Sequence, residues 1–131
     1  MKISDRYHKH AMSLLRKHKL THVECDARWS RAVFCYRTIH APKPINAMSF
    51  YVFAHEVAHH VFGDHKYDDR TGIAEIEADL WALEQLRHVR GYVPLTVHRK
   101  VHSRAAALIS HAIRYDYLSL DRLVQALTAR R

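Results

Sequence analysis

Hydrophobic residues recur at helical spacing along most of this chain, whereas a strand-like pattern appears only in its first third. The helical spacing covers residues 4–19, 46–62, 72–90, 95–115 and 119–130. Residues 32–39, AVFCYRTI, are rich in β-branched and aromatic residues and predict a strand, with a weaker strand near 21–28. A strand signal at one end of a mostly helical chain predicts an α+β fold with a small N-terminal sheet.

Capping residues, glycines and prolines lie near the ends of these predicted elements. Ser4 and Thr71 are expected to cap the helices that follow them, and Gly63 to follow the helix over 46–62. The APKP segment at 41–44 separates the strand from that helix. No linker or repeat interrupts the chain, so residues 1–131 predict a single domain.

Composition narrows the class of protein. The 131 residues are 48% hydrophobic, as in a globular chain rather than a disordered one. No apolar run is long enough for a membrane span, and the first residues lack the apolar core of a signal peptide. Cys25 and Cys35 form no CxxC and are expected to be reduced. These features predict a cytoplasmic protein with no membrane partner.

The net charge of +8 is unevenly distributed. Residues 1–54 carry ten basic against three acidic residues, and residues 87–131 carry nine against two. The intervening residues 55–86 carry only two basic against eight acidic residues. Carboxylates concentrated beside paired histidines are typical of a cation site.

The acidic segment begins with HEVAH, residues 55–59, inside the predicted helix over 46–62. At about 100° per residue, His55 and His59 lie about 40° apart, so both imidazoles face one Zn²⁺ from the same side. Glu56 lies at the edge of this face, where it reaches a zinc-bound water without being a ligand. Apolar residues opposite form a core face: Phe50, Phe53, Ala54, Val57 and Val61. The motif predicts a zinc hydrolase with Glu56 as general base, and a solvated histidine surface is the alternative.

A catalytic zinc needs a third protein ligand, and four residues after the motif are candidates. They are His65, Glu75, Glu77 and Asp79. His65 stands at the offset of the third histidine in metzincins, but Phe62 occupies the position of the glycine that this pattern requires. His65 therefore remains only an alternative ligand.

Helical spacing favours Glu75 among the carboxylates. Glu75 lies on the apolar stripe with Ala82 and Leu86, whereas Glu77 lies about 200° away on the side assigned to solvent. A buried carboxylate needs a partner, and a metal ion is such a partner. Asp79, one turn later, is expected to accept the free ring N–H of a ligand histidine. A salt bridge between Glu75 and a neighbouring Arg or His is the alternative.

These residues resemble the gluzincin class of zinc metallopeptidases. More narrowly, Ala-His-Glu at 54–56 and EIEADLWA at 75–82 are similar to the ImmA/IrrE family, which shows Ala-His-Glu-x-x-His and then Glu-x-Glu-Ala-Asn-x-Phe-Ala. Asp79 stands where that family usually has Asn. The resemblance implies a zincin-like α+β fold with a small sheet beside the active helix. It also implies an endopeptidase whose substrates are proteins such as transcriptional repressors.

Other residues are candidates for supporting roles in such an enzyme. Metallopeptidases stabilise the oxyanion with a Tyr, His or Arg besides the metal. The candidates here are His65, Tyr67 and His98, followed by Tyr115. The predicted strand over 32–39 is a candidate edge for pairing with an extended peptide substrate.

The basic flanks suggest a second class of function. His98 and His102 stand among Arg99, Lys100 and Arg104, a pattern that predicts a basic, solvated helix face. Such flanks suit an acidic or DNA-bound partner, although no helix-turn-helix, zinc-finger or RNP signature accompanies them. The alternative to an enzyme is therefore a basic nucleic-acid- or protein-binding module with a structural or vestigial zinc site.

Overall fold

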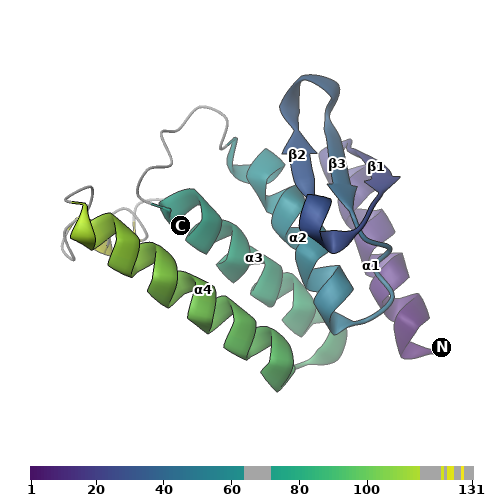
Figure 1. Ribbon diagram of the computed structural model, residues 1–131. Coiled ribbons are helices and arrows are strands. Elements are labelled where there is room, and N and C mark those ends of the chain that lie inside the picture. The colour runs from purple at the N-terminus through teal and green to yellow at the C-terminus, as the bar shows by residue number, and fades with distance from the viewer. Residues whose placement is uncertain (64–71, 116–121, 123, 126–127, 129–131) are drawn as a thin grey trace.

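The computed structural model describes residues 1–63, 72–115, 122, 124–125 and 128 (Figure 1). Within them the α-helices are α1 (Ile3–His18), α2 (Ala47–Phe62), α3 (Ile73–Arg90) and α4 (Leu95–Arg114). The strands are β1 (Thr21–Glu24), β2 (Arg31–Val33) and β3 (Thr38–Ala41), and the 3₁₀ helices are η1 (Ala27–Trp29) and η2 (Phe34–Tyr36). The predicted α+β class with a small N-terminal sheet is confirmed, while most of the helix predicted over 119–130 lies outside the described residues.

The sheet has the strand order β1-β3-β2, with β1 parallel and β2 antiparallel to β3. The single strand predicted over 32–39 is therefore wrong, because η2 divides this segment into the two arms of a hairpin. Arg37 reverses the chain in the left-handed region, with φ of 50°. No Gly or Asn marks this turn, so the apolar run has the pattern of one continuous strand.

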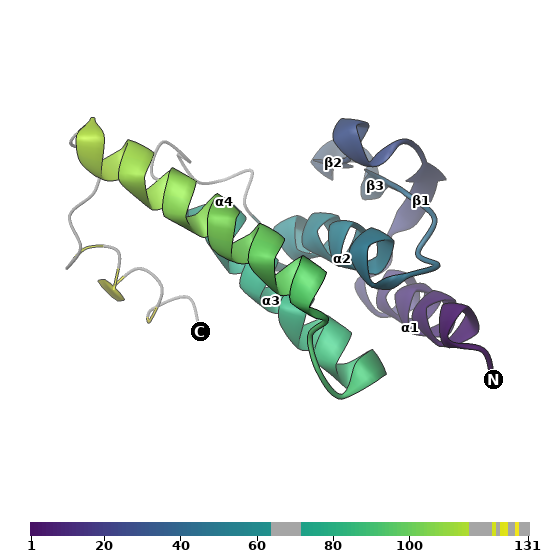
Figure 2. The same ribbon diagram turned by 60° about the horizontal axis from the view of Figure 1, so that its bottom comes forward.

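Helix α2 lies between the sheet on one side and α1, α3 and α4 on the others (Figures 1 and 2). Asn46 and Ser49 form a capping box at its start, and Gly63, with φ of 64°, ends it as predicted. Four residues of its core face are fully buried: Phe50, Phe53, Ala54 and Val57. Val61 is 37% exposed, so the buried face stops short of the end of the helix.

Helix α4 packs along α3 after a short connection at 91–94 (Figure 2). Val97 and Val101 near its start are buried in the main core. Leu108, further along, packs against Gly72 at the start of α3. The middle of α4 is thereby held beside the first turn of α3. None of the described helices is long and apolar enough to cross a membrane.

Candidate metal centre

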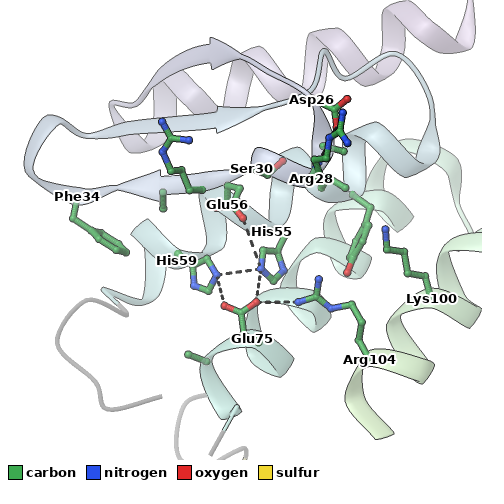
Figure 3. A pocket seen from close by; sticks show the side chains of 16 residues that line it. Asp26, Arg28, Ser30, Phe34, His55, Glu56, His59, Glu75, Lys100 and Arg104 are labelled. Carbon is green, nitrogen blue, oxygen red and sulfur yellow. Dashed lines mark hydrogen bonds and ion pairs between the residues drawn. The ribbon is translucent and has the colours of Figure 1, made fainter. Parts of the chain in front are cut away.

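The two histidines of HEVAH lie one turn apart on α2 and face the same space (Figure 3). Their Nε2 atoms are 3.1 Å apart, and the ring planes are almost perpendicular at 86°. His55 is only 6% exposed. His60, the next residue, turns to the sheet, where its Nε2 donates a hydrogen bond to the carbonyl of Thr38 at 2.9 Å. His60 lies about 140° from His55 around the helix and takes no part in the cluster.

Glu75, in the first turn of α3, lies between the two imidazoles. Its Oε1 is 3.0 Å from Nε2 of His59, and its Oε2 is 3.0 Å from Nε2 of His55. The fold therefore brings together the three side chains that the sequence predicts as zinc ligands. Gly72 precedes α3 in the left-handed region, with φ of 74°, and this turn starts the helix where its first carboxylate meets α2.

The spacing of these donor atoms fits one zinc ion. Tetrahedral zinc bonds of about 2.0–2.1 Å to nitrogen and oxygen place neighbouring ligand atoms about 3.3 Å apart. Here the two Nε2 atoms are 3.1 Å apart and each is 3.0 Å from a different oxygen of Glu75, which is close to this spacing. Two imidazoles with one glutamate are also a donor set that zinc uses in hydrolytic enzymes, with one position left for water.

The same groups stabilise one another electrostatically in the metal-free protein. Burial disfavours the charged form of His55, but hydrogen bonds to Asp79 and Glu75 outweigh it and raise its pKa above the ordinary 6.5. Burial also works against ionised Glu75, yet the hydrogen bonds from His55 and His59 hold the pKa of this carboxyl well below its ordinary range. The salt bridge weighed as an alternative for Glu75 is thus present, and it joins the same three side chains that are the candidate zinc ligands.

Asp79 supports His55 from the side away from Glu75. Nδ1 of His55 donates to Oδ1 of Asp79 at 2.7 Å, which leaves Nε2 of that ring pointing to Glu75. The Tyr51 hydroxyl donates to the same oxygen at 2.6 Å, and Asp79 is 1% exposed. This contact is the one predicted for Asp79, and it selects the tautomer that a metal needs. Tyr51 was not predicted, although its position one turn before His55 places both on one face.

Arg104 of α4 is the second residue that the sequence did not assign to the site. Its Nη2 donates to Oε2 of Glu75 at 2.9 Å, and its Nε lies 3.3 Å from Oδ2 of Asp79. The prediction that it belongs to a solvated basic face is wrong, because α4 docks against α3 and turns Arg104 to the two carboxylates. One cation therefore balances part of the negative charge beside the cluster.

Glu56 lies beside the two histidines but farther from His55 than Glu75 does. Its Oε1 is 3.9 Å from Nε2 of His55, longer than the 3.0 Å contacts of Glu75. The donor atoms of His55, Glu56 and His59 nevertheless lie within 4.8 Å of one another. Glu56 is 6% exposed, and this burial raises the pKa of its carboxyl. A carboxylate at this distance, with increased basicity, suits proton transfer to and from a water at the metal.

Glu77 contradicts its predicted place on the surface, because it is only 2% exposed. The helical wheel assumes one buried stripe, but α3 contacts α1, α2 and α4 and is buried around much of its circumference. Glu77 lines a second cavity with Phe62 and Trp81, and neither His55 nor His59 is among the residues that line it. Its burial therefore does not add it to the ligand set.

None of the candidates predicted for oxyanion stabilisation is placed in the cleft by the described residues. His65 and Tyr67 lie outside the described residues. His98 and Tyr115 are exposed on and after α4, and neither is among the residues that line the cleft over the histidines. Arg104 and Tyr51, which were not among these candidates, line the cleft and bond to Glu75 and Asp79 respectively.

A cleft of about 840 Å³ opens over the cluster. One wall comes from η1, β2 and the start of η2, the base from α2, and the other wall from the start of α3 and the middle of α4 (Figure 3). Strand β2 is at the edge of the sheet and pairs with β3 alone among the described strands. The cleft therefore places an unpaired strand edge beside the candidate metal centre.

Comparison of the chain with protein-family models, with curated proteins and with solved structures finds no match in any of the three. The site must accordingly be interpreted from its own geometry and chemistry.

Proposed function

We propose that this chain is a zinc-dependent hydrolase, with zinc held by His55, His59 and Glu75. The observation that carries the proposal is that the two Nε2 atoms lie 3.1 Å apart and each is 3.0 Å from one of the two oxygens of Glu75, with the buried Asp79 behind His55. A second carboxylate, Glu56, lies 3.9 Å from Nε2 of His55, farther than the oxygens of Glu75, and we assign it to proton transfer. Zinc with one open position supplies a polarised carbonyl and an acidified water.

More narrowly, we propose a gluzincin-type endopeptidase, similar to the ImmA/IrrE family, acting on a protein substrate. The free edge of β2 supports a peptide substrate, because an extended peptide pairs with an unpaired strand by main-chain hydrogen bonds. The order of the ligand residues along the chain, two histidines on one helix and a glutamate opening a later helix, also supports this class.

The residues of this chain divide the reaction between them. Glu56 accepts a proton from the water as its oxygen attacks the carbonyl carbon of the peptide bond. Glu56 then gives this proton to the amide nitrogen as the C–N bond breaks, so the products are a carboxylic acid and an amine. Asp79 fixes the ring of His55 throughout, and Arg104 neutralises the carboxylates behind it.

Metal content tests the first half of the proposal. Elemental analysis of the purified chain, with anomalous scattering at the zinc edge from crystals, is expected to place one zinc per chain at His55, His59 and Glu75. Glu75→Ala is expected to lose the metal, while Glu84→Ala, on the exposed side of the same helix, keeps it. A chain that binds no zinc when offered a stoichiometric excess contradicts the proposal.

Glu56→Gln separates an enzyme from a protein with a closed, structural zinc site. If Glu56 is a base, the variant keeps zinc and loses peptide hydrolysis by a factor of roughly 10² or more. If Glu56 is instead a fourth ligand, as its place within 4.8 Å of both histidines allows, the variant binds zinc more weakly. Chelator competition and cleavage of a peptide mixture, measured on the same preparation, distinguish the two outcomes.

A further inference from the structure

The cleft over the metal centre is chemically different at its two ends. Arg28, Lys100 and Arg104 lie on the side of His55, and Phe34 lies beyond His59 at the other end (Figure 3). The contacts agree with this view, because Arg104 bonds to the glutamate oxygen that also meets His55. Phe34 in turn packs against the ring of His60, with centroids 4.9 Å apart. Three of the four cations that line the cleft therefore lie on the side of His55, and an aromatic ring lies beyond His59 at the other end.

The three cations at the basic end differ in how far they are already paired. Arg104 is held by Glu75 and Asp79. Arg28 has Asp26 at 3.5 Å, but both side chains are more than half exposed, so this pair is weak. Lys100 lies one turn before Arg104 on α4 and also lines the cleft. Within the described part of the chain, no carboxylate lies within 4 Å of its ammonium group.

We infer that the basic end of the cleft binds a carboxylate of the peptide substrate, with Lys100 as its main contact and Arg28 as a second. This inference rests on the proposed peptidase function and specifies its substrate class. The carboxylate comes either from an Asp or Glu side chain close to the cleaved bond or from the C-terminus of the peptide. Both sources present the same anionic oxygens to the same two cations.

The charge of the whole cleft supports this assignment. Its lining residues include four cations and three carboxylates, and of the carboxylates Glu56 and Glu75 belong to the site itself. The third, Asp26, is next to Arg28. A divalent metal ion adds two further positive charges. The loaded cleft is therefore electropositive, and walls of low dielectric constant strengthen such a field for an entering anion.

A peptide mixture digested by the zinc-loaded full-length chain provides the first test. Mass spectrometry of the cleaved bonds is expected to show Asp, Glu or a free C-terminus enriched on one side of the cleavage site. Quenched peptides built on that site, with Glu or Gln at the enriched position and with a free or amidated C-terminus, then separate the two carboxylate sources. The preferred carboxylate is expected to raise kcat/KM by about tenfold.

A matched pair of α4 variants tests the residue. Lys100→Glu is expected to remove the preference for the Glu peptide or the free C-terminus. Arg99→Glu makes the same charge change at the adjacent exposed position outside the cleft and is expected to keep the preference. The preference should also shrink between about 0.05 and 0.5 M NaCl, since salt screens exposed ion pairs. Equal rates for all the peptides, or equal effects of both variants, overturn the inference while leaving the hydrolase intact.

A binding measurement keeps the inference testable if no peptide is cleaved, a result that would refute the proposed hydrolase. Fluorescein-labelled peptides of repeated Glu-Ala or Gln-Ala, each with a free or amidated C-terminus, are titrated with zinc-loaded protein and followed by anisotropy. The carboxylate site is supported if the carboxylate-bearing peptides bind more tightly than the others. Lys100→Glu should weaken this binding, and Arg99→Glu should leave it unchanged. Equal binding of all four peptides overturns it.

Discussion

Replacing Asp79 by alanine is expected to weaken zinc binding more than any substitution outside the three proposed ligands. Asp79 is 1% exposed, and its Oδ1 accepts from both His55 Nδ1 and the Tyr51 hydroxyl. Without this acceptor the ring of His55 is free to rotate and to adopt the tautomer that protonates Nε2. Loss of such a supporting carboxylate costs about 10- to 100-fold in metal affinity. At about 1.36 kcal/mol per factor of ten, this is about 1.4 to 2.7 kcal/mol of binding free energy.

The metal-free protein is also expected to lose stability in this variant. Alanine leaves Tyr51 and His55 without their acceptor and leaves Arg104 with one carboxylate partner instead of two. Breaking a buried charged pair on one side costs about 3–5 kcal/mol, because the remaining polar groups stay desolvated. Asp79→Asn keeps an oxygen acceptor of the same shape, so its loss of stability should be clearly smaller.

Chelator competition measures the zinc affinity of the wild type, Asp79→Ala and Asp79→Asn, and urea unfolding in the presence of chelator measures their metal-free stability. An alanine variant that binds zinc as tightly as the wild type would refute the reasoning, because orientation of His55 by Asp79 would then contribute nothing. Destabilisation without any change in zinc affinity would assign Asp79 to the fold alone.

Two further predictions concern the pH dependence and the start of α3. In the metal-free protein the raised pKa of His55 and the lowered pKa of Glu75 give a mutual stabilisation that is complete between about pH 4.5 and 6.5. This stabilisation is lost as pH rises through the pKa of His55 or falls through the pKa of Glu75. Zinc affinity, in contrast, rises as His55 deprotonates. Melting curves measured from pH 4 to 9 with chelator and with zinc should therefore diverge toward alkaline pH. Gly72→Ala is expected to cost about 1–3 kcal/mol in urea unfolding, since φ is 74° and the added Cβ would lie 3.1 Å from Leu108. Gly91→Ala is the control, because φ is 80° there and an added Cβ would have no atom within 4 Å, so the backbone strain is similar and the contact is absent. An equal loss of unfolding free energy in both variants would mean that the contact with Leu108 does not contribute.

The helices were predictable because each is long enough for its apolar spacing to repeat several times. The observed bounds of α2 and α3 differ from the predicted ranges by only a residue at their starts. The hairpin was not predictable, because its turn uses Arg37 in the left-handed region and buries neither of the aromatic residues around it completely. Tyr36, 78% exposed, contributes to the strand pattern in the sequence but lies in the turn.

In the candidate site, the residues within each helix were predictable from sequence spacing, but the contact between the helices was not. His55, Glu56 and His59 follow from one helix alone, and Glu75 with Asp79 from a second. Whether the two helices meet is a tertiary fact that no spacing within either helix contains. The error for Glu77 has the same origin, since a helix covered by several neighbours has no single solvent face.

The position of Arg104 in the sequence nevertheless indicates part of the contact between the helices. Val97, Val101, Arg104 and Leu108 recur at helical spacing, so the arginine interrupts the apolar stripe by which α4 packs against the rest of the protein. Glu75 interrupts the stripe of α3 in the same manner. A charge on an inward stripe must find a partner, and two such charges of opposite sign on neighbouring helices are each other's natural partners. The 2.9 Å contact between Arg104 and Glu75 is this pairing, and it joins α4 to the candidate metal centre.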